Sequence, residues 1–111
     1  MIRTLRILFS FIFIGIIAAT VWASLEKNVL WGFEWIFQER WGVATLADAY
    51  FGFLTFYAWV FYKETSWPGR IGWFIGIMIF GNIAMSFYML RLLFRLDESA
   101  TAADILLRKP A

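Results

Sequence analysis

Three long runs of apolar residues dominate the chain, at about residues 5–25, 43–62 and 71–90. Each run has close to the roughly 20 residues that an α-helix needs to cross a bilayer. A short turn containing Pro68 separates the second run from the third. The pattern predicts an all-α membrane protein with three transmembrane helices, in which the second and third form an antiparallel hairpin.

Residues 26–42, between the first two runs, show a different pattern. Leu30, Phe33, Phe37 and Trp41 recur at helical spacing, and most of the polar residues fall elsewhere on the helical wheel. This periodicity predicts a short amphipathic helix over about residues 30–41, lying parallel to the membrane in the interface. A loop weighted with aromatic anchors is the alternative. In either case three tryptophans are expected at headgroup depth: Trp31, Trp35 and Trp41.

The last fifteen residues differ from the rest, which divides the chain into a transmembrane domain (1–96) and a short polar tail (97–111). Thr101 and Asp104 have the spacing of a capping box, although Asp replaces the preferred Glu or Gln. One short helix is therefore expected in the tail, with an unstructured tail as the alternative.

Arg3 and Arg6 precede the first run and give it the look of a signal peptide. The run is longer than the apolar part of most signal peptides, so we expect an uncleaved helix. The same arginines favour a cytoplasmic N-terminus and, with three spans, a tail on the opposite side. If all the basic residues on each side of the membrane are counted, however, the side opposite the N-terminus carries more of them. That count favours the reverse orientation, with the N-terminus outside.

Composition supports a membrane environment and narrows the chemistry. The chain is 62% hydrophobic and 22% aromatic, against about 45–50% apolar residues in a soluble domain. It contains no Cys and no His, which removes the usual zinc ligands and His-based acid–base catalysis. We therefore expect no catalytic site, metal or cofactor. The net charge is only +2 and no basic run is present, so nucleic acid is not expected as a partner.

Asp48 is the most informative residue, because it is a carboxylate at membrane depth. On insertion scales such a residue costs about 2.5–3.5 kcal/mol. Thr45, Gly52 and Thr55 share its helical stripe, and lipid would leave the polar groups of that stripe unsatisfied. With three continuous spans, Ser86 would lie at similar depth. These positions predict a small polar pocket opening toward the tryptophan rim, with these candidate residues: Asp48, Thr55, Asn82, Ser86, Arg91 and Glu26.

Two interpretations of Asp48 remain open. As a structural residue, it would point into the bundle and bond to Asn82, Ser86, a threonine or Arg91. As a functional residue, it would exchange a proton or bind a ligand. The sequence offers no second carboxylate within the spans that could form an acid–base pair with it.

Small residues at four-residue intervals predict where helices meet, because they let backbones approach closely. The predicted contact residues are Gly15, Ala19, Gly52, Gly72 and Gly76. The contacts would form within the chain or between copies. Met78, Met85 and Met89 form another face, which could admit an apolar ligand or serve as ordinary packing.

The stretch Ala-Thr-Leu-Ala-Asp48-Ala-Tyr50-Phe-Gly52-Phe, followed by Trp59-Val-Phe-Tyr62-Lys63-Glu64 and Gly81-Asn82-Ile-Ala-Met85, resembles a family of small three-span bacterial membrane proteins. That family is known only as a domain of unknown function. The resemblance covers about residues 4–95 and leaves out the tail from Ser99. It implies a multi-pass protein of the bacterial inner membrane and no particular activity.

Three classes of function fit these observations. The first is an accessory or scaffold subunit that binds a membrane protein partner. The second is a protein that binds lipids or other hydrophobes in a lipid-modification pathway. The third is a homo-oligomeric transporter or channel. An independent enzyme fits least, because the sequence shows no nucleophile–base or metal constellation.

Overall fold

The computed structural model describes residues 1–108, and these residues form helices and connecting turns only. The helices are α1 (Ile2–Glu26), α2 (Val29–Phe37), α3 (Arg40–Lys63), α4 (Trp67–Phe80), α5 (Asn82–Phe94) and α6 (Ala102–Leu106). Two of them, α1 and α3, are long and apolar enough to cross a membrane. Both begin three residues before the corresponding predicted span.

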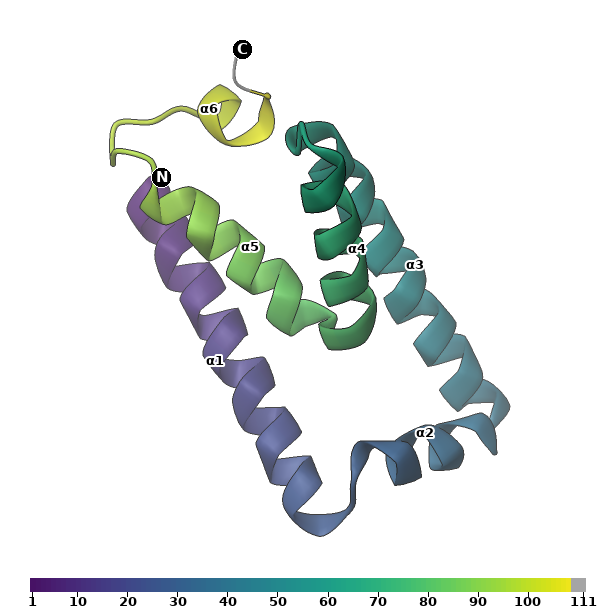
Figure 1. Ribbon diagram of the computed structural model, residues 1–111. Helices are drawn as coiled ribbons and strands as arrows, with labels where there is room; N and C mark the ends of the chain where they lie inside the picture. Colours follow the sequence, from purple (N-terminus) through teal and green to yellow (C-terminus); the bar gives the residue numbers. More distant parts are fainter. Residues whose placement is uncertain (109–111) are drawn as a thin grey trace.

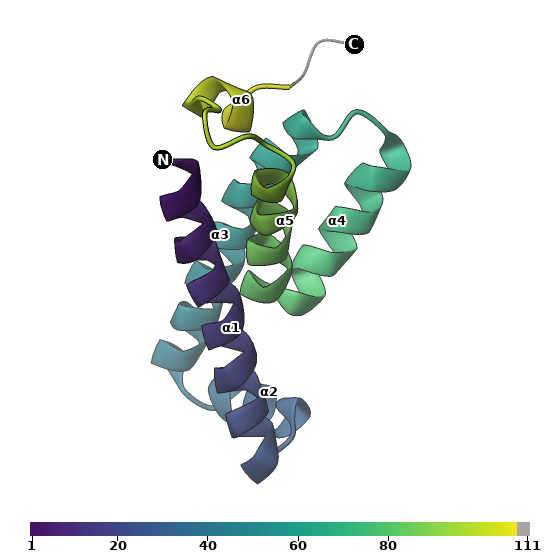
Figure 2. The ribbon, with the colours of Figure 1, turned by 90° about the vertical axis from the view of Figure 1, so that its left-hand side faces the viewer.

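The helices form an open frame around a helical hairpin (Figure 1). Helix α1 runs down from the N-terminus, α2 crosses at the far end, and α3 returns. Helix α4 then descends only part of the way and α5 turns back, as the side view also shows (Figure 2). The N-terminus, the α3–α4 turn and α6 therefore lie at one end of the molecule, the terminal end, and α2 lies at the other.

The prediction of one continuous third helix over residues 71–90 is wrong. The chain breaks at Gly81, the one residue with positive φ (56°) among residues 1–108. Glycine adopts such a φ at little cost, whereas other residues rarely adopt it. The apolar run therefore folds as two helices of 14 and 13 residues. As a result, α5 returns to the side where α1 begins, and residues 97–108 of the tail do not lie opposite the N-terminus as expected.

Helix α3 holds the turn of this hairpin in place. The Tyr50 hydroxyl donates a 3.1 Å hydrogen bond to the carbonyl of Met78, in the last turn of α4. This bond uses one of the carbonyls that a helix end leaves without an intrahelical partner. The Phe53 ring packs on Gly81 so closely that a Cβ there would lie 2.7 Å from Phe53 Cζ. The break is therefore fixed by contacts with α3 as well as by the glycine.

The core lies at the terminal end, where α5 packs between α1 and the α3–α4 pair. Leu93 and Met89 are buried together with Ile2 of α1. On the opposite side of α5, the Tyr88 ring meets Trp59 and Trp73 edge-on, at centroid distances of 5.7 and 4.8 Å. Edge-to-face aromatic pairs of this kind add to the stabilisation from buried area. Of the predicted methionine face, Met89 is buried, and Met78 and Met85 pack against this core.

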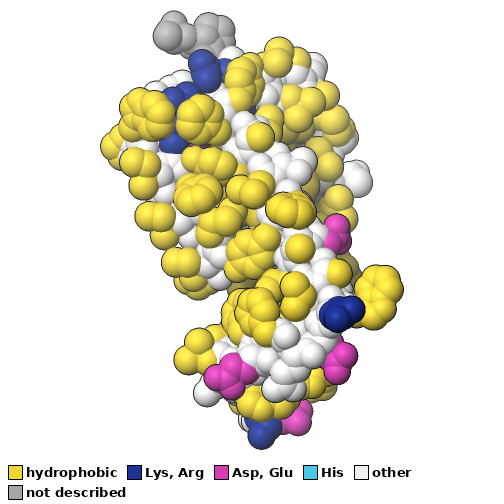
Figure 3. Space-filling model, turned by 90° about the vertical axis from the view of Figure 1, so that its right-hand side faces the viewer, with side chains coloured by type: hydrophobic (Ala, Val, Ile, Leu, Met, Phe, Trp, Pro, Cys, Tyr) yellow, Lys and Arg dark blue, Asp and Glu magenta, His cyan; other side chains and the backbone are white. Residues whose placement is uncertain are grey.

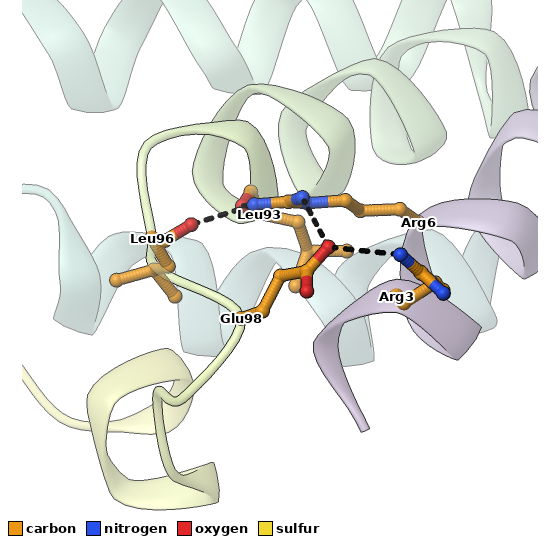
Figure 4. A network of polar contacts seen from close by, with 5 residues as sticks. All are labelled: Arg3, Arg6, Leu93, Leu96 and Glu98. Atoms are coloured by element: carbon orange, nitrogen blue, oxygen red, sulfur yellow. Dashed lines mark hydrogen bonds and ion pairs between the residues drawn. The ribbon is translucent and has the colours of Figure 1, made fainter.

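Arg6 ties the start of α1 to the end of α5 (Figure 4). Its guanidinium donates two bonds to the Leu93 carbonyl, at 3.1 and 3.2 Å, and one of 2.6 Å to that of Leu96. Glu98 lies 4.0 Å from Arg6 and 3.6 Å from Arg3. A cation at a helix C-terminus interacts favourably with the exposed carbonyls there. Arg6 therefore closes the hairpin against α1.

Replacing Arg6 with Met is expected to lower the free energy of unfolding in detergent by at least about 2 kcal/mol, because even one hydrogen bond to a charged group contributes roughly 1.5–3 kcal/mol. Arg3→Met is the matched control. Its side chain is 77% exposed and makes only the ion pair with Glu98, so little change is expected. Chemical denaturation of both variants measures the difference, and equal stabilities would contradict this role for Arg6.

A helix between the first two apolar runs is present as predicted, but it spans Val29–Phe37 and does not reach residue 41. Trp41 instead lies in the first turn of α3. Its N-cap is Asn28, whose side chain accepts a 2.9 Å bond from the Trp31 backbone N–H. Trp31, Trp35 and Trp41 are exposed, and their placement at headgroup depth stays a prediction. A Cβ on Gly42 would lie 2.5 Å from the Ile36 carbonyl oxygen, so glycine permits the tight corner into α3.

The tail folds into a short helix, and the capping box of Thr101 and Asp104 is present. It packs back on the terminal end, where Ile105 is 5% exposed. The Trp59 indole N–H donates a 2.9 Å bond to the Leu106 carbonyl, and the Arg108 guanidinium donates one of 2.7 Å to the carbonyl of Tyr62. The described part of the tail is therefore attached to α3. Residues 109–111 lie outside the part that the structure describes.

Candidate functional site

The outer face of α3 carries a continuous stripe of small and polar residues. Thr45, Asp48, Gly52 and Thr55 are all exposed, and they recur at intervals of three and four residues. Such spacing keeps side chains on one side of a helix. No other helix of the described chain covers this α3 stripe. Viewed from the side on which α3 lies, hydrophobic side chains cover most of the upper half, and acidic ones lie from the middle downward (Figure 3).

The prediction that Asp48 points into the bundle is wrong. Asp48 is exposed and makes no hydrogen bond or ion pair with any residue from 1 to 108. The neighbouring hydroxyls are satisfied within α3, since Thr45 donates to the Trp41 carbonyl and Thr55 to that of Phe51. Asp48 is thus the one polar side chain of the α3 stripe that the described chain leaves without a hydrogen-bond partner.

The other candidates for a polar pocket do not assemble around Asp48, because the hairpin turns α5 back toward the terminal end. Ser86 is buried and donates to the carbonyls of Asn82 (2.6 Å) and Ile83 (3.2 Å) in its own helix. Asn82 is exposed at the hairpin tip. Arg91 lies near the terminal end and Glu26 at the α2 end, both exposed. The predicted single pocket is therefore not formed.

The glycines expected at helix contacts have empty space beside them in the described chain. A Cβ on Gly15, Gly52, Gly72 or Gly76 would meet nothing within 4 Å. Ala19 is also exposed, in a hollow between α1 and α2. Contacts of these residues within the chain are thus excluded for the described structure, and contacts with another chain stay a prediction.

Gly72 and Gly76 instead line an apolar groove. It lies between α4 and Phe13 of α1, with Ile83, Ala84 and Phe87 of α5 along it, and has a volume of about 530 Å³. Pro68 and Gly69 stand at one end and Phe80 at the other. None of its lining residues is charged. We call this cavity the α4–α5 groove.

Nothing in the described part of the chain forms a metal centre, since no group of three or more Cys, His, Asp or Glu side chains could hold an ion there. The comparison with protein families decides the relationship of the chain. A family model described as "Protein of unknown function (DUF1475)" matches residues 2–108. The chain belongs to this family. No curated protein and no solved structure matches it.

The family match confirms the predicted resemblance to a domain of unknown function and extends it. The matched region includes α6 and the preceding loop, so the expectation that the tail lies outside the family is wrong. The packing of Ile105 on the core gives a physical reason why the tail belongs to the domain. The match assigns no activity, ligand or catalytic residue.

The sequence alone does not predict the α4–α5 groove, although it predicts close contacts at two of its lining residues, Gly72 and Gly76. A small-residue pair of this kind indicates only close approach, whether by a helix or by a ligand. Phe87 and Phe13 come near each other, at a centroid distance of 6.2 Å, only because α5 folds back against α1. The missing signal was the turn formed by the Gly81-Asn82 dipeptide.

Proposed function

We propose that this protein is an accessory or scaffold subunit of the membrane, which binds another polypeptide through the α3 stripe. The observation that carries the proposal is Asp48, exposed and without a hydrogen-bond partner in the described chain. Helix α3 has 24 residues, a length of about 36 Å at 1.5 Å per residue. Asp48 lies four residues from the helix centre, well inside a hydrocarbon core of about 30 Å.

The physical argument is the cost of leaving this carboxylate in lipid. Backbone or side-chain donors of another chain would offset a penalty of about 2.5–3.5 kcal/mol. The surrounding residues suit such a partner, because Gly52 offers open space and small residues permit close dispersion contacts between helices in a membrane. The proposed occupant of the α3 stripe is a transmembrane helix that carries a hydrogen-bond donor.

The distribution of charge supports an orientation for the membrane-inserted protein. The α2 end holds Lys27 and Arg40, whereas these basic residues gather at the terminal end: Arg3, Arg6, Lys63, Arg70, Arg91, Arg95 and Arg108. The positive-inside rule then favours a cytoplasmic terminal end. In this proposal α1 and α3 cross a bacterial inner membrane, and α4 and α5 re-enter it from the cytoplasmic side.

Site-specific photocrosslinking tests the proposed function. A benzoyl-phenylalanine at Phe51, which is 67% exposed beside Asp48, is expected to give one discrete adduct with another polypeptide in native membranes at native expression level. Phe11 of α1 is the matched control, since it is also a phenylalanine and is 76% exposed. It is expected to give only diffuse or lipid-derived products.

The outcomes separate the candidate partners. An adduct of twice the chain mass identifies a second copy, and any other discrete mass identifies a different subunit. An absence of adducts from position 51, with normal abundance of the labelled protein, would contradict the proposal.

A further inference from the structure

The α4–α5 groove has the length of one bilayer leaflet. It extends along α4 from Pro68 to Phe80, which is about 18 Å of helix. A hydrocarbon core of about 30 Å leaves roughly 15 Å for each leaflet. The hairpin tip at Gly81 therefore lies near mid-membrane when the terminal end sits at the surface. The groove is thus open to a single acyl chain of the leaflet on the terminal side.

The lining of the groove fits an acyl chain better than it fits a polar ligand. The lining residues are aromatic, aliphatic, proline or glycine side chains, and the volume of about 530 Å³ lies within the usual range of ligand pockets. Trp73 and Phe87, whose rings are 6.2 Å apart, line it from α4 and α5. The open space over Gly72 and Gly76 supplies the depth.

Arg91 and Arg95 follow the groove-lining residues of α5 along the helix, toward the terminal end. Both are exposed, and neither makes a hydrogen bond or ion pair within the described residues. On a helical wheel Ala84, Phe87, Arg91 and Arg95 form one stripe, so the arginines continue the groove side of α5 toward the terminal end. Arg91 lies nine residues beyond Asn82, about 13 Å above the tip. This is the depth at which a long basic side chain reaches the headgroups.

We propose that the α4–α5 groove binds one anionic phospholipid, with an acyl chain along Gly72 and Gly76 and the headgroup phosphate on Arg91 and Arg95. Guanidinium groups are well suited to phosphate, because they can donate two parallel hydrogen bonds. Unpaired arginines favour a lipid with net negative charge over a zwitterionic one. The inference rests on membrane insertion from the proposed function, and it is independent of a partner at the α3 stripe.

Native mass spectrometry of the purified full-length chain in detergent tests the proposal, with phosphatidylglycerol and phosphatidylcholine as the two probes. The parent is expected to retain one phosphatidylglycerol with an affinity about tenfold or more above that for phosphatidylcholine. Arg91→Gln combined with Arg95→Gln should remove this preference. Gly76→Leu, which fills open space, should weaken the binding of both lipids, and Gly72→Leu provides a second variant of the same kind.

Two matched controls keep the result specific. Gly15→Leu also enlarges an open glycine, but on α1 and outside the groove lining, and Arg40→Gln removes an exposed charge at the α2 end. Both should bind lipid like the parent. Equal binding of the two lipids by the parent, or full retention of phosphatidylglycerol by both groove variants, would overturn the proposal. A dimer that Gly76→Leu dissociates, with no preference between lipids, would assign the groove to a second copy and would also overturn it.

Discussion

Replacing Gly81 with Ala is expected to destabilise the described chain strongly. The backbone at Gly81 has φ 56° and ψ −123°, and holding a residue with a side chain in such a region costs about 1–3 kcal/mol. The new Cβ would also lie 2.7 Å from Phe53 Cζ and would push that ring away from the turn. Thermal unfolding in detergent should show a midpoint lowered by several degrees.

Gly76→Ala is the matched control for this prediction. Gly76 lies inside α4, and a Cβ there meets nothing within 4 Å. Because alanine is the better helix former by roughly 0.5–1 kcal/mol, the control should be neutral or stabilising. Adding Phe53→Leu to Gly81→Ala should restore part of the loss, since it removes the clash and leaves the backbone strain. If Gly81→Ala proved as stable as Gly76→Ala, this would contradict the hairpin turn at Gly81.

Substitutions at Asp48 are expected to have the largest effect on association. Asp48→Leu removes a carboxylate that has no hydrogen-bond partner in the described chain, so the stability of the isolated protein in detergent should be unchanged or higher. The discrete adduct from position 51 should fall about tenfold, since the donor of the partner helix would lose its acceptor and a buried unsatisfied donor costs about 1–3 kcal/mol. Asp48→Asn, which keeps shape and most hydrogen bonding, should give an intermediate yield.

A threonine of the same stripe serves as the control for Asp48. The Thr55 hydroxyl already donates to the Phe51 carbonyl at 2.9 Å, so Thr55→Val removes a neutral acceptor from the stripe and no charge. Its adduct yield should fall much less than that of Asp48→Leu. A loss of stability in Asp48→Leu, with the adduct retained, would mean that Asp48 serves the fold of this chain and not an interface.

Local patterns predicted most of the helices. The lengths of the first two apolar runs predicted α1 and α3, and the spacing of Leu30, Phe33 and Phe37 predicted α2. The capping box of Thr101 and Asp104 predicted α6. Each of these signals lies within the sequence of one helix. Each depends only on contacts inside that helix or on its apolar environment. Predictions of this kind need no knowledge of the tertiary structure.

The break at Gly81 could not be derived in this way. Isolated glycines are tolerated in a membrane helix, so hydropathy alone favours a continuous helix over residues 71–90. The decisive contacts come from Tyr50 and Phe53, about thirty residues earlier in the chain. The Gly81-Asn82 dipeptide was a turn signal, but only these contacts select the turn over the helix. That one error put Ser86 and Arg91 at the wrong depth, which is why the predicted pocket around Asp48 does not form.

The most direct test of the account is the accessibility of single cysteines from either side of the membrane. The chain has no cysteine of its own, so each introduced residue reports alone. Thr4, Thr65 and Ser99 are exposed at the terminal end, and Gln38 is exposed at the α2 end. With a membrane-impermeant maleimide on intact cells, only Gln38→Cys should be labelled, and the other three variants should react after permeabilisation. Labelling of Ser99→Cys together with Gln38→Cys would show a third crossing and would contradict the re-entrant hairpin.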